Sequence, residues 1–257
     1  CGSVLLDHPT CANPEACHAG QQGALLLALE AAAYLFDELG MKAEKQSSLN
    51  LAARVSQCIP DAGRSKPAAA FQALAGMLDA EKANSEILAK DPLLDFSPFF
   101  GYFILQARAL AGDIQGSLDA IRTFWGAMID LGATTFWEGF ELSWVENAGR
   151  IDELPSPGKR DIHAECGDYC YKGLRNSFCH GWSAGPTAWL LEHVLGFRPL
   201  APGCRELAVR PNLGDLEWAS GSFPTPFGDV TVQHVKTRDG GIKSKIDAPG
   251  AVKIIKA

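Results

Sequence analysis

The hydrophobic pattern changes its period near residue 198, and this change constrains the fold more than any other feature of the sequence. Before it, apolar residues recur at intervals of three and four, which is typical of helices buried along one face. After it, apolar and polar residues alternate in short runs between Pro- and Gly-containing turns, as in antiparallel strands. The sequence therefore predicts a mainly α protein with a C-terminal all-β domain, divided into residues 1–197 and 198–257.

Capping signals locate the predicted helices. Ser97-Pro98 supplies an N-cap and a first-turn proline, and Gly40 and Gly196 follow the last periodic residues of two helices. A β-domain of this size buries too little surface to be robust alone, so we expect it to pack on the helices. Helices are predicted at 21–39, 49–57, 67–78, 81–90, 97–111, 114–131 and 185–195. Strands are predicted at 206–210, 216–222, 229–236 and 241–246.

Composition excludes several classes of protein. A formal net charge of −7 argues against nucleic acid as a partner, because that would need a basic face. No apolar run is long enough to predict a membrane span. The eight cysteines are too sparse for a small disulfide scaffold. Cys166 and Cys170 lie near His163 but lack a matching second pair, so no zinc site is predicted; no cofactor of any kind is expected.

One carboxylate is set among aromatic residues. Glu138 directly follows Phe136 and Trp137 at the end of an apolar helical run. Burying such a charge without a partner is costly, so a protein keeps the arrangement mostly where it needs a tuned proton affinity. The aromatic faces suit the apolar faces of a sugar ring. Glu138 is therefore a candidate catalytic or ligand-orienting acid in a carbohydrate site. An exposed glutamate after a core Phe-Trp pair is the alternative.

Five motifs follow one another in a fixed order along the chain. Together they resemble the C-terminal half of the α-L-rhamnosidases of glycoside hydrolase family 78, from about residue 5 to the C-terminus. The motifs are ATTFWE at 133–138, CHGWSAGPT at 179–187, LGFRP at 195–199, GDLEWASGS at 214–222 and PTPFGD at 224–229.

The resemblance implies a fold and a mechanism. Such enzymes have an (α/α)6 barrel followed by a C-terminal β-sandwich, so this chain looks like half of the barrel plus a small antiparallel β-sandwich. The family hydrolyses terminal α-L-rhamnosides with inversion, which requires two carboxyl groups about 6.5–9.5 Å apart. Glu138 matches the general base. The general acid belongs to an earlier part of the barrel, the missing N-terminal half, so we expect these 257 residues alone to be nearly inactive.

The resemblance also suggests residues that bind the sugar. His180 matches a histidine near the sugar, and Asp7 falls where members carry a sugar-binding aspartate. The aromatic residues beside Glu138 either stack on the sugar or hold the base in place. For each candidate, core packing or helix capping is the alternative. The predicted substrate-binding residues are His180, Asp7, Trp137, Phe136, Trp182 and His18, and no metal ligand is predicted.

Residues 141–178 have no clear period and are rich in aromatic and charged side chains. Long irregular segments of this kind are often functional, although a surface insertion is equally compatible with the pattern.

Three functions stay open. The first is the C-terminal part of an inverting α-L-rhamnosidase acting on a rhamnose-containing glycoside. The second is another (α/α)6 glycosidase, such as a glucosidase or a trehalase-like enzyme. The third is a non-catalytic carbohydrate-binding protein. For the full-length protein we expect a periplasmic or exported location rather than a cytoplasmic one.

Overall fold

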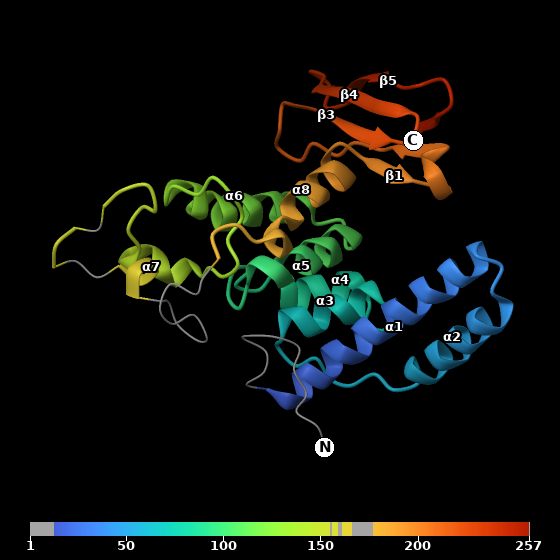
Figure 1. Ribbon diagram of the computed structural model, residues 1–257, viewed down its shortest axis with the longest axis horizontal. Coiled ribbons are helices and arrows are strands. Elements are labelled where there is room, and N and C mark those ends of the chain that lie inside the picture. The colour runs from blue at the N-terminus through green and yellow to red at the C-terminus, as the bar shows by residue number, and fades with distance from the viewer. Residues whose placement is uncertain (1–12, 155, 159–160, 166–176, 257) are drawn as a thin grey trace.

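A helical region leads into a β region at the C-terminus (Figure 1). The computed structural model describes residues 13–154, 156–158, 161–165 and 177–256. The predicted order, mainly α and then β, is confirmed. No helix in the described part of the chain is long and apolar enough to cross a lipid bilayer.

Side-chain caps begin most of the longer helices. Ser97 accepts from Phe100 N at the start of α5, as predicted, and Asp113 accepts from Gly116 N at the start of α6. The first helix begins earlier than its period suggested, because Asn13 caps it and Pro14 occupies its first turn. The helices are α1 (Pro14–Glu38), α2 (Lys42–Val55), α3 (Lys66–Leu74), α4 (Ala80–Ala83), α5 (Pro98–Leu110), α6 (Ile114–Asp130), α7 (Ile162–Glu165) and α8 (Gly185–Trp189).

Several shorter helical turns connect or extend these helices. Two predicted helices each continue as a π-helical turn, so the run at 81–90 becomes α4 plus η2 and the run at 185–195 becomes α8 plus η5. The turns are η2 (Asn84–Leu88), η3 (Leu142–Asn147), η4 (Gly181–Ser183), η5 (Leu190–Val194) and η6 (Pro202–Cys204).

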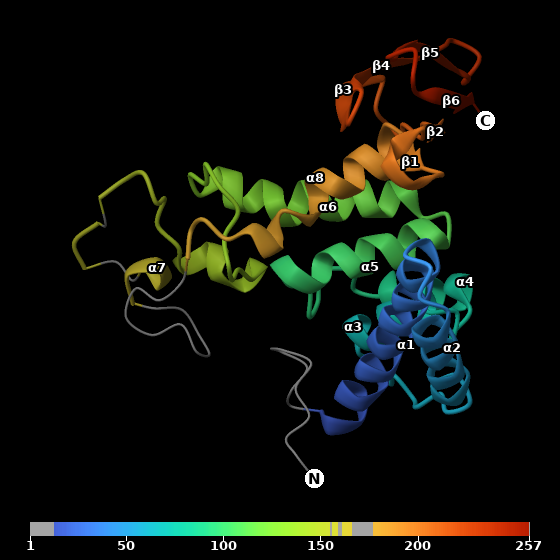
Figure 2. The same ribbon diagram turned by 45° about the vertical axis from the view of Figure 1, so that its right-hand side comes forward.

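The helices pack in neighbouring pairs around an aromatic core. Helices α1 and α2 run side by side, and α3 lies between α1 and α5 (Figures 1 and 2). Helix α1 approaches α3 closely at Gly23, where a Cβ atom would lie 2.7 Å from the main-chain carbon of Phe71. The ring of Phe71 packs edge-on against Phe100 of α5. This arrangement fits the predicted half of a barrel, which itself remains a prediction.

The C-terminal strands form two three-stranded sheets, ordered β1-β2-β6 and β3-β4-β5. The second sheet is antiparallel throughout, but in the first sheet β6 pairs with β2 in parallel. The prediction of a purely antiparallel region is therefore wrong for this pair of strands. Two short strands, β1 and β6, were not predicted. The strands are β1 (Phe197–Pro199), β2 (Glu206–Val209), β3 (Trp218–Thr225), β4 (Gly228–Lys236), β5 (Ile242–Asp247) and β6 (Lys253–Lys256).

The β region contacts α6 and the end of η5, the helical turn that precedes β1. The buried His234 of β4 has its Nε2 3.2 Å from the carbonyl oxygen of Leu195, and Arg122 of α6 pairs with Asp215 at 2.6 Å. Gly196 has a φ of 78° and lies so close to Arg210 that a Cβ atom would overlap its main chain. A glycine is therefore required at position 196, between the last helical turn and the first strand.

Candidate functional site

Two loop segments that are far apart in the sequence lie side by side around Glu138. The amide of Glu138 donates to the carbonyl of Ser177 at 2.8 Å, and the amide of His180 donates to the carbonyl of Phe136 at 2.7 Å. The hydroxyl of Thr135 donates to the carbonyl of Phe178. These bonds tie residues 135–138 to residues 177–180 without a regular sheet.

The Glu138 carboxylate is held by a main-chain donor and faces a histidine. The amide of Ser177 donates to Oε2 at 3.0 Å, and Nδ1 of His180 lies 3.9 Å from the same oxygen. The Glu138 side chain is 22% exposed and that of His180 is 34% exposed. The carboxylate is therefore fixed in direction and partly open to solvent. The distance to His180 is too long for a direct hydrogen bond.

Trp182 covers one side of this pair. Its Nε1 donates to the carbonyl oxygen of Glu138 at 2.8 Å, and its ring lies 4.6 Å from that of His180. The ring also meets that of Phe99, in the first turn of α5, at 5.3 Å. The Trp182 residue is still 37% exposed. A partly exposed aromatic ring beside a carboxylate and an imidazole is suited to contact a sugar.

The two aromatic residues before Glu138 have a different setting. Trp137 is fully buried, with its ring edge-on to Phe140, Phe178 and His163. Phe136 is half-buried and packs against the same core. This geometry favours the second of the two roles weighed from the sequence, in which these rings hold Glu138 in place rather than stack on a sugar.

In the irregular region 141–178, the side chain of His163 supports the residues next to Glu138, a role that was not predicted from the sequence. Nδ1 of His163 lies 3.1 Å from the carbonyl oxygen of Gly149, and its ring meets Trp137 at 5.0 Å and Phe178 at 5.4 Å. Burial lowers the pKa of His163, and the bond to Gly149 and the charge of Asp161 oppose that effect only in part. The imidazole packs against both Trp137 and Phe178, the residues next to Glu138 and Ser177, which also contact each other at 5.1 Å. No sequence spacing signals this contact.

Of the remaining predicted residues, His18 is the one in the described part of the chain, and it is not brought to this pair. Asp7 lies outside the described residues, as do Cys166 and Cys170 of the discounted zinc motif. His18 is exposed in the first turns of α1, and no contact joins it to Glu138. Within the described ranges, no group of three or more His, Cys, Asp or Glu side chains is placed to hold a metal ion. The site described here consists of Glu138, His180 and Trp182.

Comparison with known proteins agrees with the motifs. Residues 196–255 match the family model described as the bacterial alpha-L-rhamnosidase C-terminal domain. A curated alpha-L-rhamnosidase from Alteromonas sp. (strain LOR) is 32% identical over 117 residues, which is 45% of this chain and 10% of that protein. The chain is similar to the C-terminal portion of the family 78 α-L-rhamnosidases.

Solved structures show the same fold. The GH78 family rhamnosidase of Bacillus sp. GL1 aligns with 90% of this chain at a TM-score of 0.68 and 24% identity. The Streptomyces avermitilis alpha-L-rhamnosidase, solved in complex with L-rhamnose, aligns with 98% of it at a TM-score of 0.67 and 20% identity. The chain spans 25% and 24% of those two proteins. The activity of a whole rhamnosidase is therefore a proposal for this protein.

Proposed function

We propose that this chain supplies the general base of an inverting glycoside hydrolase that cleaves terminal α-L-rhamnosides. The observation that carries the proposal is the Glu138 carboxylate, which a main-chain amide holds at 3.0 Å while part of it stays exposed beside His180 and Trp182. The similarity to rhamnosidases favours rhamnosides over the glycosides that other (α/α)6 glycosidases cleave.

Each residue of the site has a distinct role in the proposed reaction. Glu138 accepts a proton from a water molecule as that water attacks the anomeric carbon of the sugar. His180 donates or accepts a hydrogen bond at a sugar hydroxyl or through water to Glu138. Trp182 offers its ring to an apolar face of the sugar and fixes the main chain of Glu138 through its indole N–H. The proton for the departing oxygen comes from a carboxylic acid elsewhere in the full-length protein, so the C–O bond breaks without a charged leaving group.

This scheme defines the substrate and the distance between the two carboxyl groups. The substrate is a rhamnose-containing oligosaccharide or glycoside, and the second carboxyl group stands about 6.5–9.5 Å from Glu138 to leave room for the water.

The test is Glu138→Gln in the full-length protein, assayed on an aryl α-L-rhamnoside. Loss of the base should lower kcat by about 10²- to 10⁴-fold, because water is no longer deprotonated as it attacks. Azide needs no base, so it should restore turnover and give the glycosyl azide of inverted configuration. Circular dichroism and the midpoint of thermal unfolding should match the wild type.

A matched control is Glu141→Gln. Glu141 is a half-buried glutamate three positions after Glu138, and the proposed reaction gives it no role. Its kcat should stay within a few-fold of wild type. Equal activity in wild type and Glu138→Gln, or product of retained configuration, would contradict the proposal.

A further inference from the structure

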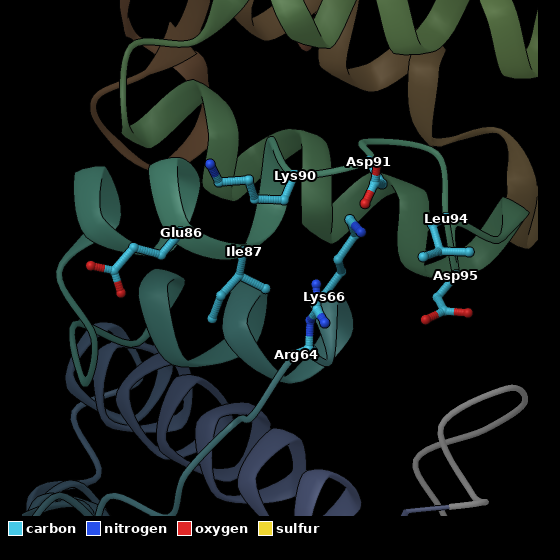
Figure 3. A pocket seen from close by; sticks show the side chains of 8 residues that line it. All are labelled: Arg64, Lys66, Glu86, Ile87, Lys90, Asp91, Leu94 and Asp95. Carbon is cyan, nitrogen blue, oxygen red and sulfur yellow. The ribbon is translucent and has the colours of Figure 1, made fainter.

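A separate cavity of about 280 Å³ opens where α3 begins, between that helix, η2 and the loop before α5. Its lining holds three basic side chains (Arg64, Lys66 and Lys90), three acidic ones and two apolar ones (Figure 3). The acidic side chains are Glu86, Asp91 and Asp95, and the apolar ones are Ile87 and Leu94. This volume is close to the lower end of the range for ligand pockets in proteins.

Lys66 forms the buried part of this cavity. The residue is only 4% exposed, and Figure 3 shows its side chain reaching from the start of α3 toward Asp91. Within the part of the chain that the structure describes, no carboxylate lies within 4.0 Å of its ammonium group. Burial lowers the pKa of Lys66, although the charges of Asp95 and Asp91 act in the opposite direction. Among the described residues, Lys66 therefore faces the cavity without a direct carboxylate partner, and an anionic group bound there would stabilise its charged form.

The same loop holds its carboxylates in a constrained backbone. Asp91 and Asp95 have φ angles of 43° and 56°, in the left-handed region that residues other than glycine seldom adopt. Both residues are exposed at the cavity, where their carboxylates are available to accept hydrogen bonds.

The balance of charges selects a ligand class. A bare phosphate would meet three carboxylates, and a divalent cation would meet three basic groups. A polyol that carries one carboxylate satisfies both sets, because Lys66 and Arg64 bind the acid while Asp91 and Asp95 accept from hydroxyl groups. Ile87 and Leu94 then contact the C–H face of the ring.

The cavity is linked to the Glu138 site through a short stretch of chain. Phe96, next to Asp95, packs edge-on against Trp125, whose Nε1 donates to the carbonyl of Ser183 at 3.0 Å. Phe99, four residues after Asp95, meets Trp182 at 5.3 Å. The chain that follows the two aspartates therefore also contacts Trp182, whose indole donates to the Glu138 carbonyl.

We propose that this cavity binds the carboxylated unit, a hexuronate, of an acidic oligosaccharide. As a binding site it stands on the cavity alone. Only the identification of that oligosaccharide with the substrate cleaved at Glu138 rests on the proposed function.

The test is a titration of the full-length protein with sodium D-glucuronate and with D-glucose, followed by ligand-observed NMR. The two probes share a ring and differ mainly in the carboxylate. We expect glucuronate to bind at least tenfold more tightly than glucose. Lys66→Met keeps the length of the side chain and removes the charge, so it should weaken glucuronate binding by about tenfold or more and still fold.

The matched control is Lys42→Met, because Lys42 occupies the first position of α2 as Lys66 does in α3, but is exposed. It should bind glucuronate as the wild type does. Glu138→Gln should also bind glucuronate normally, and this separates the cavity from the catalytic site even if no rhamnoside is cleaved.

Three results would overturn the proposal. The first is equal binding of glucose and glucuronate, and the second is unchanged binding by Lys66→Met. The third is no glucuronate binding at all, the result expected if another segment of the full-length protein fills the cavity.

Discussion

The part of the chain that matches a family model and the part that holds Glu138 are different regions. The match covers residues 196–255, where two small sheets form around a core of Phe197, Leu207 and Val230. Glu138 lies in the helical region, on a loop fixed by residues some forty positions later. The β region is therefore the recognisable structural unit, whereas the candidate chemistry depends on a few long-range loop contacts. The following predictions test that separation, from the largest effect to the smallest.

The largest effect should come from testing the 257-residue polypeptide by itself against the full-length protein. Under the proposed scheme, in which these residues supply the base and another segment supplies the acid, it should turn over an aryl α-L-rhamnoside about 10²- to 10⁴-fold more slowly, since proton transfer to the leaving group is lost. Initial rates at equal molar concentrations measure this. Comparable rates for the two would place both carboxyl groups within these residues.

Phe197→Ala should damage the β region and spare the chemistry. Phe197 is 2% exposed in the core of that region, so truncation should cost about 3–5 kcal/mol of unfolding free energy. Chemical denaturation of the full-length protein measures this loss. The control is Trp218→Ala on β3, where the side chain is 65% exposed and little stability should be lost.

In the same Phe197→Ala protein, kcat per folded molecule should stay within about twofold of wild type, because no residue of the site contacts Phe197. A large fall in kcat at temperatures where the variant is folded would show that the two regions are functionally coupled.

Asp113→Ala should destabilise the helical region. Arg108 is only 4% exposed in its side chain and donates to Asp113 through Nε at 2.9 Å and Nη2 at 2.8 Å, while Asp113 also caps α6. Burial alone would raise the pKa of Asp113, but the hydrogen bonds and charge of Arg108 outweigh it and the pKa lies below its ordinary value. Removing the carboxylate leaves a buried guanidinium unpaired, which should cost about 3 kcal/mol.

The control for that variant is Asp215→Ala, which breaks an exposed pair with Arg122 between the two regions. Thermal unfolding should be almost unchanged, as for most surface ion pairs. A larger loss for Asp215 than for Asp113 would mean that the junction, rather than the helical core, limits stability.

The smallest effect should come from Trp182→Phe. The change keeps a ring beside His180 but removes the indole donor to the Glu138 carbonyl, a bond worth about 0.5–1.5 kcal/mol net. We expect kcat to fall by up to about tenfold, with KM changed less. A rise in KM alone would assign Trp182 to sugar binding and not to the position of Glu138.

The helices could be predicted well where local signals agree. The Ser97 cap and the helix at 114–131 both depend on neighbours within one or two turns. Strands β1 and β6 are only three and four residues long, and β6 forms by pairing in parallel with β2. Nothing local in their sequences specifies that pairing, so alternation could not reveal them.

The site could be predicted only in part for the same reason. The motifs identified Glu138, His180 and Trp182, which the structure brings together. They did not identify Ser177, which acts through its main chain, or His163, which reaches Trp137 across an irregular segment. Both contacts depend on how segments far apart in the sequence pack together. The type of a single residue does not indicate such a contact.

The bond from the Ser177 amide to Glu138 has a consequence for how this protein can evolve. Because the donor belongs to the backbone, the bond itself does not require a serine; the Ser177 hydroxyl acts only on the path of the loop, where it accepts from the amide of Cys179 at 3.3 Å. Only proline, which carries no amide hydrogen, would silence the donor at position 177. We therefore expect the backbone conformation of this loop to be more constrained in evolution than the residue type at position 177. Relatives with a different residue there can keep the same orientation of the carboxylate.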